Sequence, residues 1–305
     1  MCELNVQNTV PTRQYTRRNL AKVDKSQYTK EEWHRLRAER RLKKEQDRRH
    51  KVSEEAKEQQ SPQTVPEFNP NITNYVVCLK FGNKYGPEYV NNLNSMVKRN
   101  LTIPYEFVCF TEDPRGLDSD VRVMPIRSNS DMHGWWYKVM FFDPQLPLRG
   151  NILFMDLDVI VFGNINNLFT FQPKKFCIIR DFNRSLRRDW KKMNSSVFRL
   201  QAGAHPHVYN EFMLDPKSHV RRLHGDQDWI YEKMSKQDFL FWPDEWIQSY
   251  KWEMRDRRDL ARLNGKRNFK NIADPIIKPE TNIAVFHGEP YPHEVRDPWV
   301  VDNWR

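Results

Sequence analysis

The sequence contains no run of 18 or more apolar residues, which argues against a helix that spans a membrane. Its first residues lack a basic segment followed by an apolar stretch, so we expect no signal peptide. Only four residues are Cys, and no two of them have the spacing of a metal site. Three lie in apolar, strand-like segments, where free Cys behaves as a small hydrophobic side chain. We therefore expect reduced thiols in a cytoplasmic protein.

The sequence does contain the apolar residues that a folded core requires. It is 38% hydrophobic and 13% aromatic, whereas chains that stay unfolded are poor in aromatic residues. The net charge of +10 is unevenly distributed, because residues 1–65 carry 16 Lys and Arg against 10 Asp and Glu. A basic excess suits anionic partners such as nucleic acid, a membrane face or phosphorylated ligands, without selecting among them.

The N-terminal 65 residues are predicted to form a basic, disordered to helical extension. Thr29 and Glu32 have the spacing of a capping box and predict a helix that continues to about Gln60. The body of this helix is almost wholly charged and has no apolar stripe, so we interpret it as a solvated appendage. The alternative is that the basic helix contacts nucleic acid, a membrane or another protein. Three prolines within residues 61–70 predict a linker.

Residues 66–305 are expected to form the folded domain, because strand-like and helical segments alternate along them. Apolar runs predict strands at 74–80, 105–110, 121–126, 152–155 and 176–179, and helical spacing predicts helices at 87–99 and 135–142. This alternation predicts an α/β fold, with a Rossmann-like, mixed but mainly parallel sheet flanked by helices. In such sheets, ligands bind beyond the carboxyl ends of the strands.

Two acids follow the strand predicted at 152–155. Asp156 and Asp158 are flanked on both sides by residues that should be buried. A carboxylate beside a core strand is costly unless it is paired or bound to a cation, and a second carboxylate raises that cost. Mg²⁺ or Mn²⁺ prefers carboxylate oxygens and leaves room for substrate phosphates. The alternative is that both acids bind loop amides. Two further Asp-x-Asp pairs lack buried flanks: Asp118/Asp120 and Asp226/Asp228.

A metal at these acids suggests a reaction class. Cleavage of a sugar–diphosphate bond leaves negative charge on the departing diphosphate, and a cation that bridges its oxygens acts as a Lewis acid. The acid pair therefore favours a transferase that expels a nucleoside diphosphate.

Six segments carry a resemblance to a known family and occur in that family's order: Phe107–Asp113, Trp136–Lys138, Met155–Asp158, Asn194–Phe198, Gly225–Asp228 and Phe286–Gly288. From about Tyr75 to Trp304, the chain resembles the GT-A nucleotide-diphospho-sugar transferases, and among them the retaining, glycogenin-like glycosyltransferase family 8. The resemblance implies a metal-dependent glycosyltransferase that uses a nucleotide sugar, most simply a UDP-sugar. The acceptor would be a glycan, a lipid-linked group or a protein, and transfer would retain the anomeric configuration.

The resemblance also implies roles for individual residues. Asp156, Asp158 and His287 would hold Mn²⁺ or Mg²⁺. His287 follows an apolar run and should emerge at a strand end, where neutral imidazole can complete a carboxylate site; the alternative is a hydrogen-bonded core histidine. The catalytic residues would lie at the reacting centre: Asn194, Gln227 and Asp228. Donor contacts would come from Thr111, Asp113, Lys138, Asp156 and Gly288.

Several of these residues have a structural interpretation as well. Thr111 and Asp113 also fit a simple turn before a proline, and Asp226 fits a helix N-cap. Lys138 also fits a helix residue that extends its ammonium to solvent.

The sequence departs from the family pattern at two positions. Tyr291 stands about where a diphosphate-binding Lys is expected, and Lys251 and Arg296 are candidates to replace it. Ser196 stands in place of Gly and would narrow the sugar pocket.

Two competing functions remain open at this point. A sugar nucleotidyltransferase would share the fold and the metal, but it needs a Gly-rich, basic loop after the first strand. The segment Lys80–Gly86 has two Gly and two Lys, which falls short of a phosphate cradle. A non-enzymatic adaptor that binds nucleic acid through residues 13–57 would leave the buried acid pair unexplained.

Overall fold

The computed structural model describes residues 73–126, 132–255, 275–295 and 297–305. All of them belong to one compact unit, Val65–Arg305. The predicted N-terminal helix and linker lie outside the described residues, so the extension and its contact with an anionic partner stay predictions. Within the described part, no helix is both long enough and apolar enough to cross a membrane.

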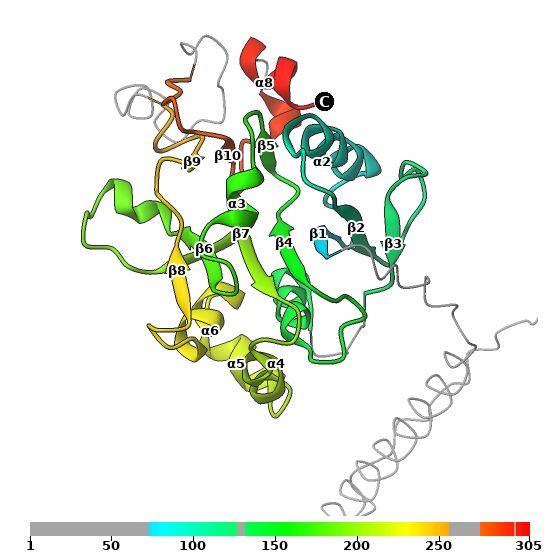
Figure 1. Ribbon diagram of the computed structural model, residues 1–305, viewed down its shortest axis with the longest axis vertical. Helices are drawn as coiled ribbons and strands as arrows, with labels where there is room; N and C mark the ends of the chain where they lie inside the picture. Colours follow the sequence, from blue (N-terminus) through cyan, green and yellow to red (C-terminus); the bar gives the residue numbers. More distant parts are fainter. Residues whose placement is uncertain (1–72, 127–131, 256–274, 296) are drawn as a thin grey trace, which may run out of the picture. The chain divides into compact units, whose positions relative to one another are not determined.

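The described chain folds as an α/β structure with two sheets (Figure 1). The large sheet contains, in spatial order, β3 (Arg122–Met124), β2 (Glu106–Thr111), β1 (Asn74–Lys80), β4 (Asn151–Met155), β7 (Met193–Gln201), β6 (Phe176–Arg180) and β8 (Phe239–Phe241). Its strands are parallel except for β7, which is antiparallel to both β4 and β6. The mixed, mainly parallel sheet predicted from the sequence is therefore confirmed.

A second, smaller sheet has three short strands, in the order β5 (Val159–Val161), β10 (Ile283–Val285) and β9 (Ile247–Ser249). Strand β10 is antiparallel to β5 and parallel to β9. The small sheet thus joins a strand from the middle of the chain to one close to its C-terminus.

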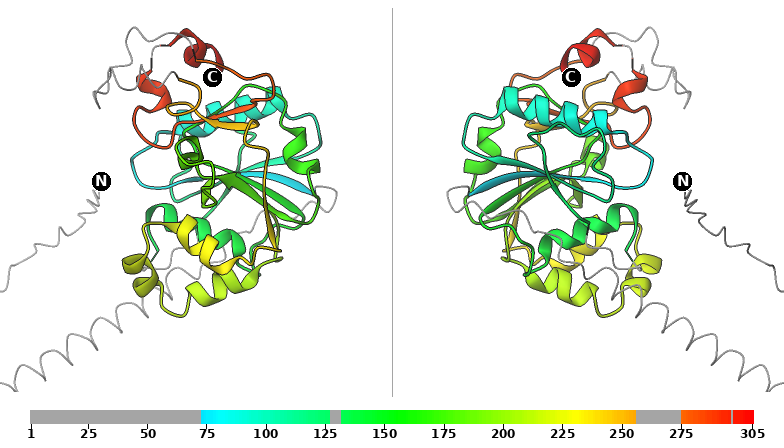
Figure 2. Two further views of the ribbon diagram at one scale, coloured as in Figure 1. Left: turned by 90° about the vertical axis from the view of Figure 1, so that its left-hand side faces the viewer. Right: turned by 90° about the vertical axis from the view of Figure 1, so that its right-hand side faces the viewer.

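Helices cover both faces of the large sheet, as the edge-on views of Figure 2 show. One face carries α2 (Pro87–Asn100), α3 (Asn166–Thr170) and α8 (Pro298–Asn303). The opposite face carries the 3₁₀ helix η2 (Gly134–Phe142), α4 (Pro206–Phe212), α5 (Pro216–Arg222) and α6 (Asp226–Lys233). Two short 3₁₀ turns complete the elements of the described residues: η3 (Phe182–Ser185) and η4 (Pro292–Glu294).

Alternate residues of each central strand enter two separate cores. Cys78 of β1 packs toward α2, whereas its neighbour Val77 packs toward η2. A sheet buried on both faces needs strands that are apolar almost throughout, which explains why apolar runs located β1 and β4 in the sequence. Cys78 in β1, Cys109 in β2 and Cys177 in β6 are free and buried, as predicted.

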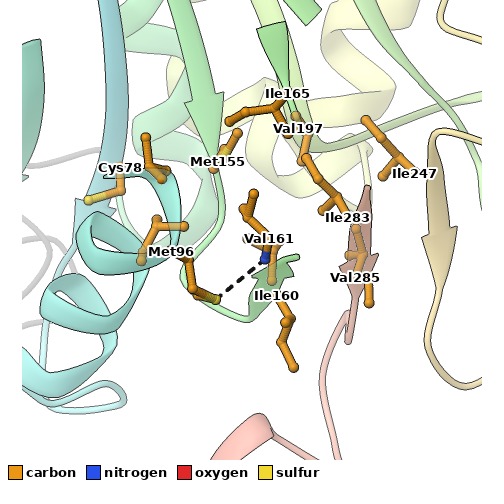
Figure 3. Close-up of a cluster of buried hydrophobic side chains, with 14 of the residues drawn as sticks. Cys78, Met96, Met155, Ile160, Val161, Ile165, Val197, Ile247, Ile283 and Val285 are labelled. Atoms are coloured by element: carbon orange, nitrogen blue, oxygen red, sulfur yellow. Dashed lines mark hydrogen bonds between the residues drawn. The ribbon is translucent and has the colours of Figure 1, made fainter. Parts of the chain in front are cut away.

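The core under α2 also holds the two sheets together (Figure 3). Met96 of α2 lies in this cluster with Met155 of β4 and Val285 of β10, and its Sδ accepts a hydrogen bond of 3.4 Å from the Val161 amide of β5. Strands β4 and β5 are therefore packed in the same core beneath α2. The three residues between them line the candidate site.

Candidate active site

Asp156 and Asp158 lie on the turn that connects the two sheets, between the end of β4 and the start of β5. Leu157, between them, is buried in the core beneath α2. The two acids line a cavity of about 470 Å³, to which Leu157 also contributes. Burial of the central leucine therefore explains how both carboxylates are held at the sheet edge with their side chains available to a ligand.

Antiparallel pairing brings residues distant in sequence to the same turn. The Asp156 amide donates to the Ser196 carbonyl (2.8 Å), which places the polar start of β7, including Asn194, beside the acids. The Phe286 amide donates to the Asp158 carbonyl (3.0 Å), which brings the residues after β10 to the other side. Both Asn194 and His287 line the cavity as a result.

The loop after β10 turns sharply back toward Asp158. His287 and Gly288 both have left-handed backbone conformations, with φ of 38° and 92°. Glycine adopts such values without steric cost, and a second left-handed residue beside it is uncommon. This turn directs the Gly288 amide to Asp158 Oδ2, at 3.1 Å. The same carboxylate oxygen accepts a hydrogen bond of 3.3 Å from the Tyr85 hydroxyl.

A buried lysine neutralises the first acid. Lys138 of η2 places its Nζ 2.8 Å and 2.9 Å from the two carboxylate oxygens of Asp156, and donates to the carbonyl and hydroxyl oxygens of Ser195. Burial raises the pKa of Asp156 to about 6, against the lowering effect of Lys138. Burial alone would lower the pKa of Lys138, but the charges of Asp156 and Asp226 outweigh it and raise that pKa.

Asp226 supplies a third carboxylate to the cavity. It is only 3% exposed, and within the described residues its Oδ2 has no hydrogen-bond partner. Burial raises its pKa. The N-cap of α6 is Gly225, so the interpretation of Asp226 as the N-cap is wrong. Gln227 and Asp228 follow on the first turn of α6 and line the same cavity, and their role at a reacting centre stays a prediction.

His287 is a neutral imidazole held by its surroundings. Its Nε2 lies 2.6 Å from the Ser249 hydroxyl, and its ring stacks on Phe182. Burial, and then the positive charge of Lys251, lowers the pKa of His287 to about 3. Lys251 itself donates to the carbonyl oxygens of His287 and Glu289, so it supports the loop after β10.

The donor atoms around the cavity have the chemistry of a Mg²⁺ or Mn²⁺ site, since they are carboxylate oxygens and a neutral imidazole. The unpartnered oxygen of Asp226 is consistent with a missing cationic or hydrogen-bonding ligand. The three predicted ligands, Asp156, Asp158 and His287, all line the cavity. They do not converge, however: among residues 73–126, 132–255, 275–295 and 297–305, no three His, Cys, Asp or Glu side chains are close enough to hold an ion.

Three of the predicted donor-binding residues do not line the cavity: Thr111, Asp113 and Lys251. The Thr111 hydroxyl accepts from the Asp113 amide (3.1 Å), and the Asp113 carboxylate pairs with Arg115. This segment forms the turn that the alternative interpretation described. Arg296, the other candidate for the missing phosphate-binding cation, lies outside the described residues.

Sequence reasoning missed several residues that line the cavity, among them Lys84, Tyr85 and Trp135. The Lys84 ammonium lies 4.8 Å from the centre of the Tyr85 ring and 5.0 Å from that of Tyr291. The signal for this site was present in the sequence, because two lysines lie in the Gly-containing loop after the first strand. The same loop, Lys80–Gly86, is the one that falls short of a triphosphate-binding cradle.

Comparison with known proteins identifies the fold. No known family profile matches the chain, and no curated protein matches it in sequence. The glycosyltransferase GlyE of Streptococcus pneumoniae superposes with a TM-score of 0.52 at 13% identity, over 72% of this chain and 56% of that one. An active-site mutant of LgtC superposes with a TM-score of 0.50 at 12% identity, over 73% and 90%. The fold is the GT-A glycosyltransferase fold.

Within this GT-A fold, the cavity occupies the position that the sequence predicted. Leu79 and Phe81 at the end of β1 line it together with Asp156 at the end of β4. These are the carboxyl ends of adjacent parallel strands, where open α/β sheets bind their ligands. The chain spans about half the length of the GlyE chain that it matches.

Proposed function

We propose that the protein is a metal-dependent glycosyltransferase that moves a sugar from a nucleotide-diphosphate sugar, most simply a UDP-sugar, to an acceptor. One observation carries the proposal: in a GT-A fold, Asp156, Asp158 and Asp226 face a single cavity at the carboxyl ends of β1 and β4. Only one buried lysine lies among these three carboxylates in the described part of the cavity wall. A further cation would balance the remaining charge.

Asp156 and Asp158 would hold Mg²⁺ or Mn²⁺, with His287 as a third ligand after local rearrangement. When bound, the ion would stabilise negative charge on the departing diphosphate. The Ser249 hydroxyl fixes the imidazole: with Nε2–H donating to Ser249, the Nδ1 atom keeps the lone pair that ligation requires. The low pKa of His287 keeps that lone pair available at neutral pH.

Asn194, Gln227 and Asp228 would act at the sugar. Amide and carboxylate groups can hydrogen-bond sugar hydroxyls, and a carboxylate stabilises positive charge that develops at the anomeric carbon. All three line the cavity from the two elements that flank Asp156, namely β7 and α6. Retention of configuration rests on the resemblance to the glycogenin-like group.

Lys84 is the residue best placed to contact the diphosphate. Lys138 is engaged by Asp156, and Lys251 by two carbonyl oxygens, whereas the Lys84 ammonium rests against the rings of Tyr85 and Tyr291 and lines the cavity. Tyr291 stands where the glycogenin-like family is expected to have its diphosphate-binding lysine, and its ring contacts the Lys84 ammonium. Lys84 would replace that missing cation.

Lys84→Met should weaken the binding of UDP about fivefold, because it removes one exposed charge-assisted contact of about 1 kcal/mol. Isothermal titration calorimetry with UDP and Mn²⁺, at two salt concentrations, measures the loss. The effect should shrink at high salt, because salt screens exposed charges.

Lys98→Met is the matched control, because it removes the same charge from α2, where Lys98 pairs with Asp120 and does not line the cavity. Equal UDP affinities for Lys84→Met and the wild type would remove Lys84 from the donor site.

A thermal-shift screen tests the function as a whole. Nucleotide sugars and UDP, each with and without Mn²⁺, should raise the melting temperature only in combination with the metal, since a ligand that binds the native state stabilises it. Incubation with a nucleoside triphosphate and a sugar phosphate distinguishes the nucleotidyltransferase alternative by release of pyrophosphate. If no nucleotide sugar binds with or without Mn²⁺, the proposed function is wrong.

A further inference from the structure

One wall of the cavity carries an exposed indole that the proposed chemistry does not use. Trp135 lines the cavity, yet it is 54% exposed, whereas its neighbour Trp136 is buried and stacks on Phe212. A large apolar surface beside polar catalytic groups is the usual composition of a ligand pocket. Covering the exposed part of such a ring by a ligand is favourable, because it removes apolar surface from water.

The helix that carries Trp135 also carries Lys138, the lysine that binds Asp156. Trp135 and Lys138 are three residues apart in the 3₁₀ helix η2. Side chains with this spacing are eclipsed in a 3₁₀ helix, so the indole follows the same face as the lysine that binds Asp156. Gly134, with a left-handed φ of 59°, forms the turn that starts this helix.

The indole is also fixed from the side of α6. A β-carbon at Gly225 would lie 3.3 Å from Nε1 and 3.5 Å from Cδ1 of Trp135. Any side chain at this position would press on the ring, so a glycine at the α6 N-cap lets one edge of the indole rest against the backbone. The next residues of α6, Gln227 and Asp228, line the cavity and provide polar groups beside the ring.

Different elements contact the two acids. Asp158 is bonded to Tyr85 and Gly288, and Tyr85 lies next to Lys84, the proposed diphosphate contact. Asp156 is bonded to Lys138, on the helix that carries Trp135. The indole therefore belongs to η2 and, through Gly225, adjoins α6 with its proposed catalytic residues, rather than the loop that carries Lys84.

We propose that Trp135 is the stacking platform of the acceptor subsite, and that the acceptor group is a pyranose sugar. This inference rests on the proposed function. An aromatic face covers the C–H surface of a pyranose ring, and the polar residues that line the cavity beside it can hydrogen-bond hydroxyls of the acceptor as well as of the transferred sugar. The acceptor would thus be a glycan or a glycosylated molecule, rather than an unmodified protein side chain.

The test measures two ligands separately on the full-length protein. A panel of methyl pyranosides of common hexoses and pentoses is titrated against protein saturated with UDP and Mn²⁺, by ligand-observed NMR. The wild type should bind at least one of them, and Trp135→Ala should bind it roughly tenfold more weakly. Trp135→Phe, which keeps a ring, should lose less. The affinity for UDP should be the same in all three proteins.

Leu214→Ala is the control, because it shortens a side chain that is 83% exposed and does not line the cavity. Three results would overturn the inference: a loss of UDP affinity in Trp135→Ala, equal pyranoside binding by Trp135→Ala and the wild type, or no pyranoside bound by wild-type protein that binds UDP. Failure to bind UDP at all would instead contradict the proposed function, so the two failures are distinguishable.

Discussion

Asp158→Asn should abolish Mn²⁺-dependent cleavage of a nucleotide sugar while the protein remains folded. Asparagine keeps the shape of the side chain and an oxygen that can accept from the Gly288 amide, but it removes the negative charge that would hold a cation. Loss of about 4 kcal/mol of transition-state stabilisation corresponds to a roughly thousandfold lower rate. Release of UDP, measured over a series of Mn²⁺ concentrations, gives the rate, and a thermal melt monitors folding.

The sequence offers a matched control with the same Asp-x-Asp spacing. Asp120 lies on the surface, where it pairs with Lys98, and both side chains are about half exposed. Asp120→Asn removes one negative charge without touching the cavity and should keep wild-type turnover. Unchanged turnover in Asp158→Asn would refute the assignment of Asp158 to the reaction.

Lys138→Met should destabilise the protein strongly, because it leaves Asp156 and Asp226 without the ammonium that faces both of them. Removing one partner of a buried ion pair costs about 3–5 kcal/mol. For a domain of this size, that corresponds to a melting temperature lower by about 10 °C. Mn²⁺ should restore more stability to this variant than to the wild type, because the cation no longer competes with the lysine for Asp156.

Differential scanning fluorimetry of both proteins, with and without Mn²⁺, measures this difference. Lys98→Met again serves as the control, since its half-exposed ion pair contributes little stability and should give no additional Mn²⁺ effect. An equal response of Lys138→Met and the wild type to Mn²⁺ would show that the ion does not bind beside Asp156.

Strands buried on both faces could be predicted from the sequence, because they are apolar throughout. The predicted strand at 74–80 coincides with β1, and the one at 152–155 differs from β4 by a single residue. Asp156 and Asp158 were recognisable because they are charged residues that directly follow an apolar strand. Helix α2 was recognisable from its helical spacing, and its apolar face, which includes Leu93, is buried.

Strand β7 could not be recognised, although it forms one wall of the site. Its first half is polar, and it also contains Arg199, which is 1% exposed and donates to the carbonyl oxygens of Leu168 and Phe169. Such buried polar residues are satisfied by partners far away in the sequence, so no local pattern predicts their burial. The predicted segment at Asn194 came from the family resemblance alone.

Only one strand of the small sheet was predicted, namely the apolar run before His287 that contains β10, and the other two escaped prediction for a different reason. Strands β5 and β9 have three residues each, which is too short for periodicity to appear. Position at the end of a strand was also a poor guide for Thr111 and Asp113. These residues follow a strand, as ligand-binding residues do, but they bond to each other and to Arg115 and do not line the cavity. The place of Trp135 at the cavity became recognisable only once the elements around the cavity were placed, whereas Lys84 lies in a Gly-containing loop whose two lysines are visible in the sequence.

The pairing of β5 with β10 has a consequence for biosynthesis. Domains generally fold as units. Strands β1, β2 and β4 and helix α2 precede β5 in the sequence, but β5 can pair with β10 only after synthesis has passed Ile283–Val285. His287 and Gly288 reach Asp158 through that pairing. The cavity is therefore incomplete in a nascent chain until synthesis has passed Gly288.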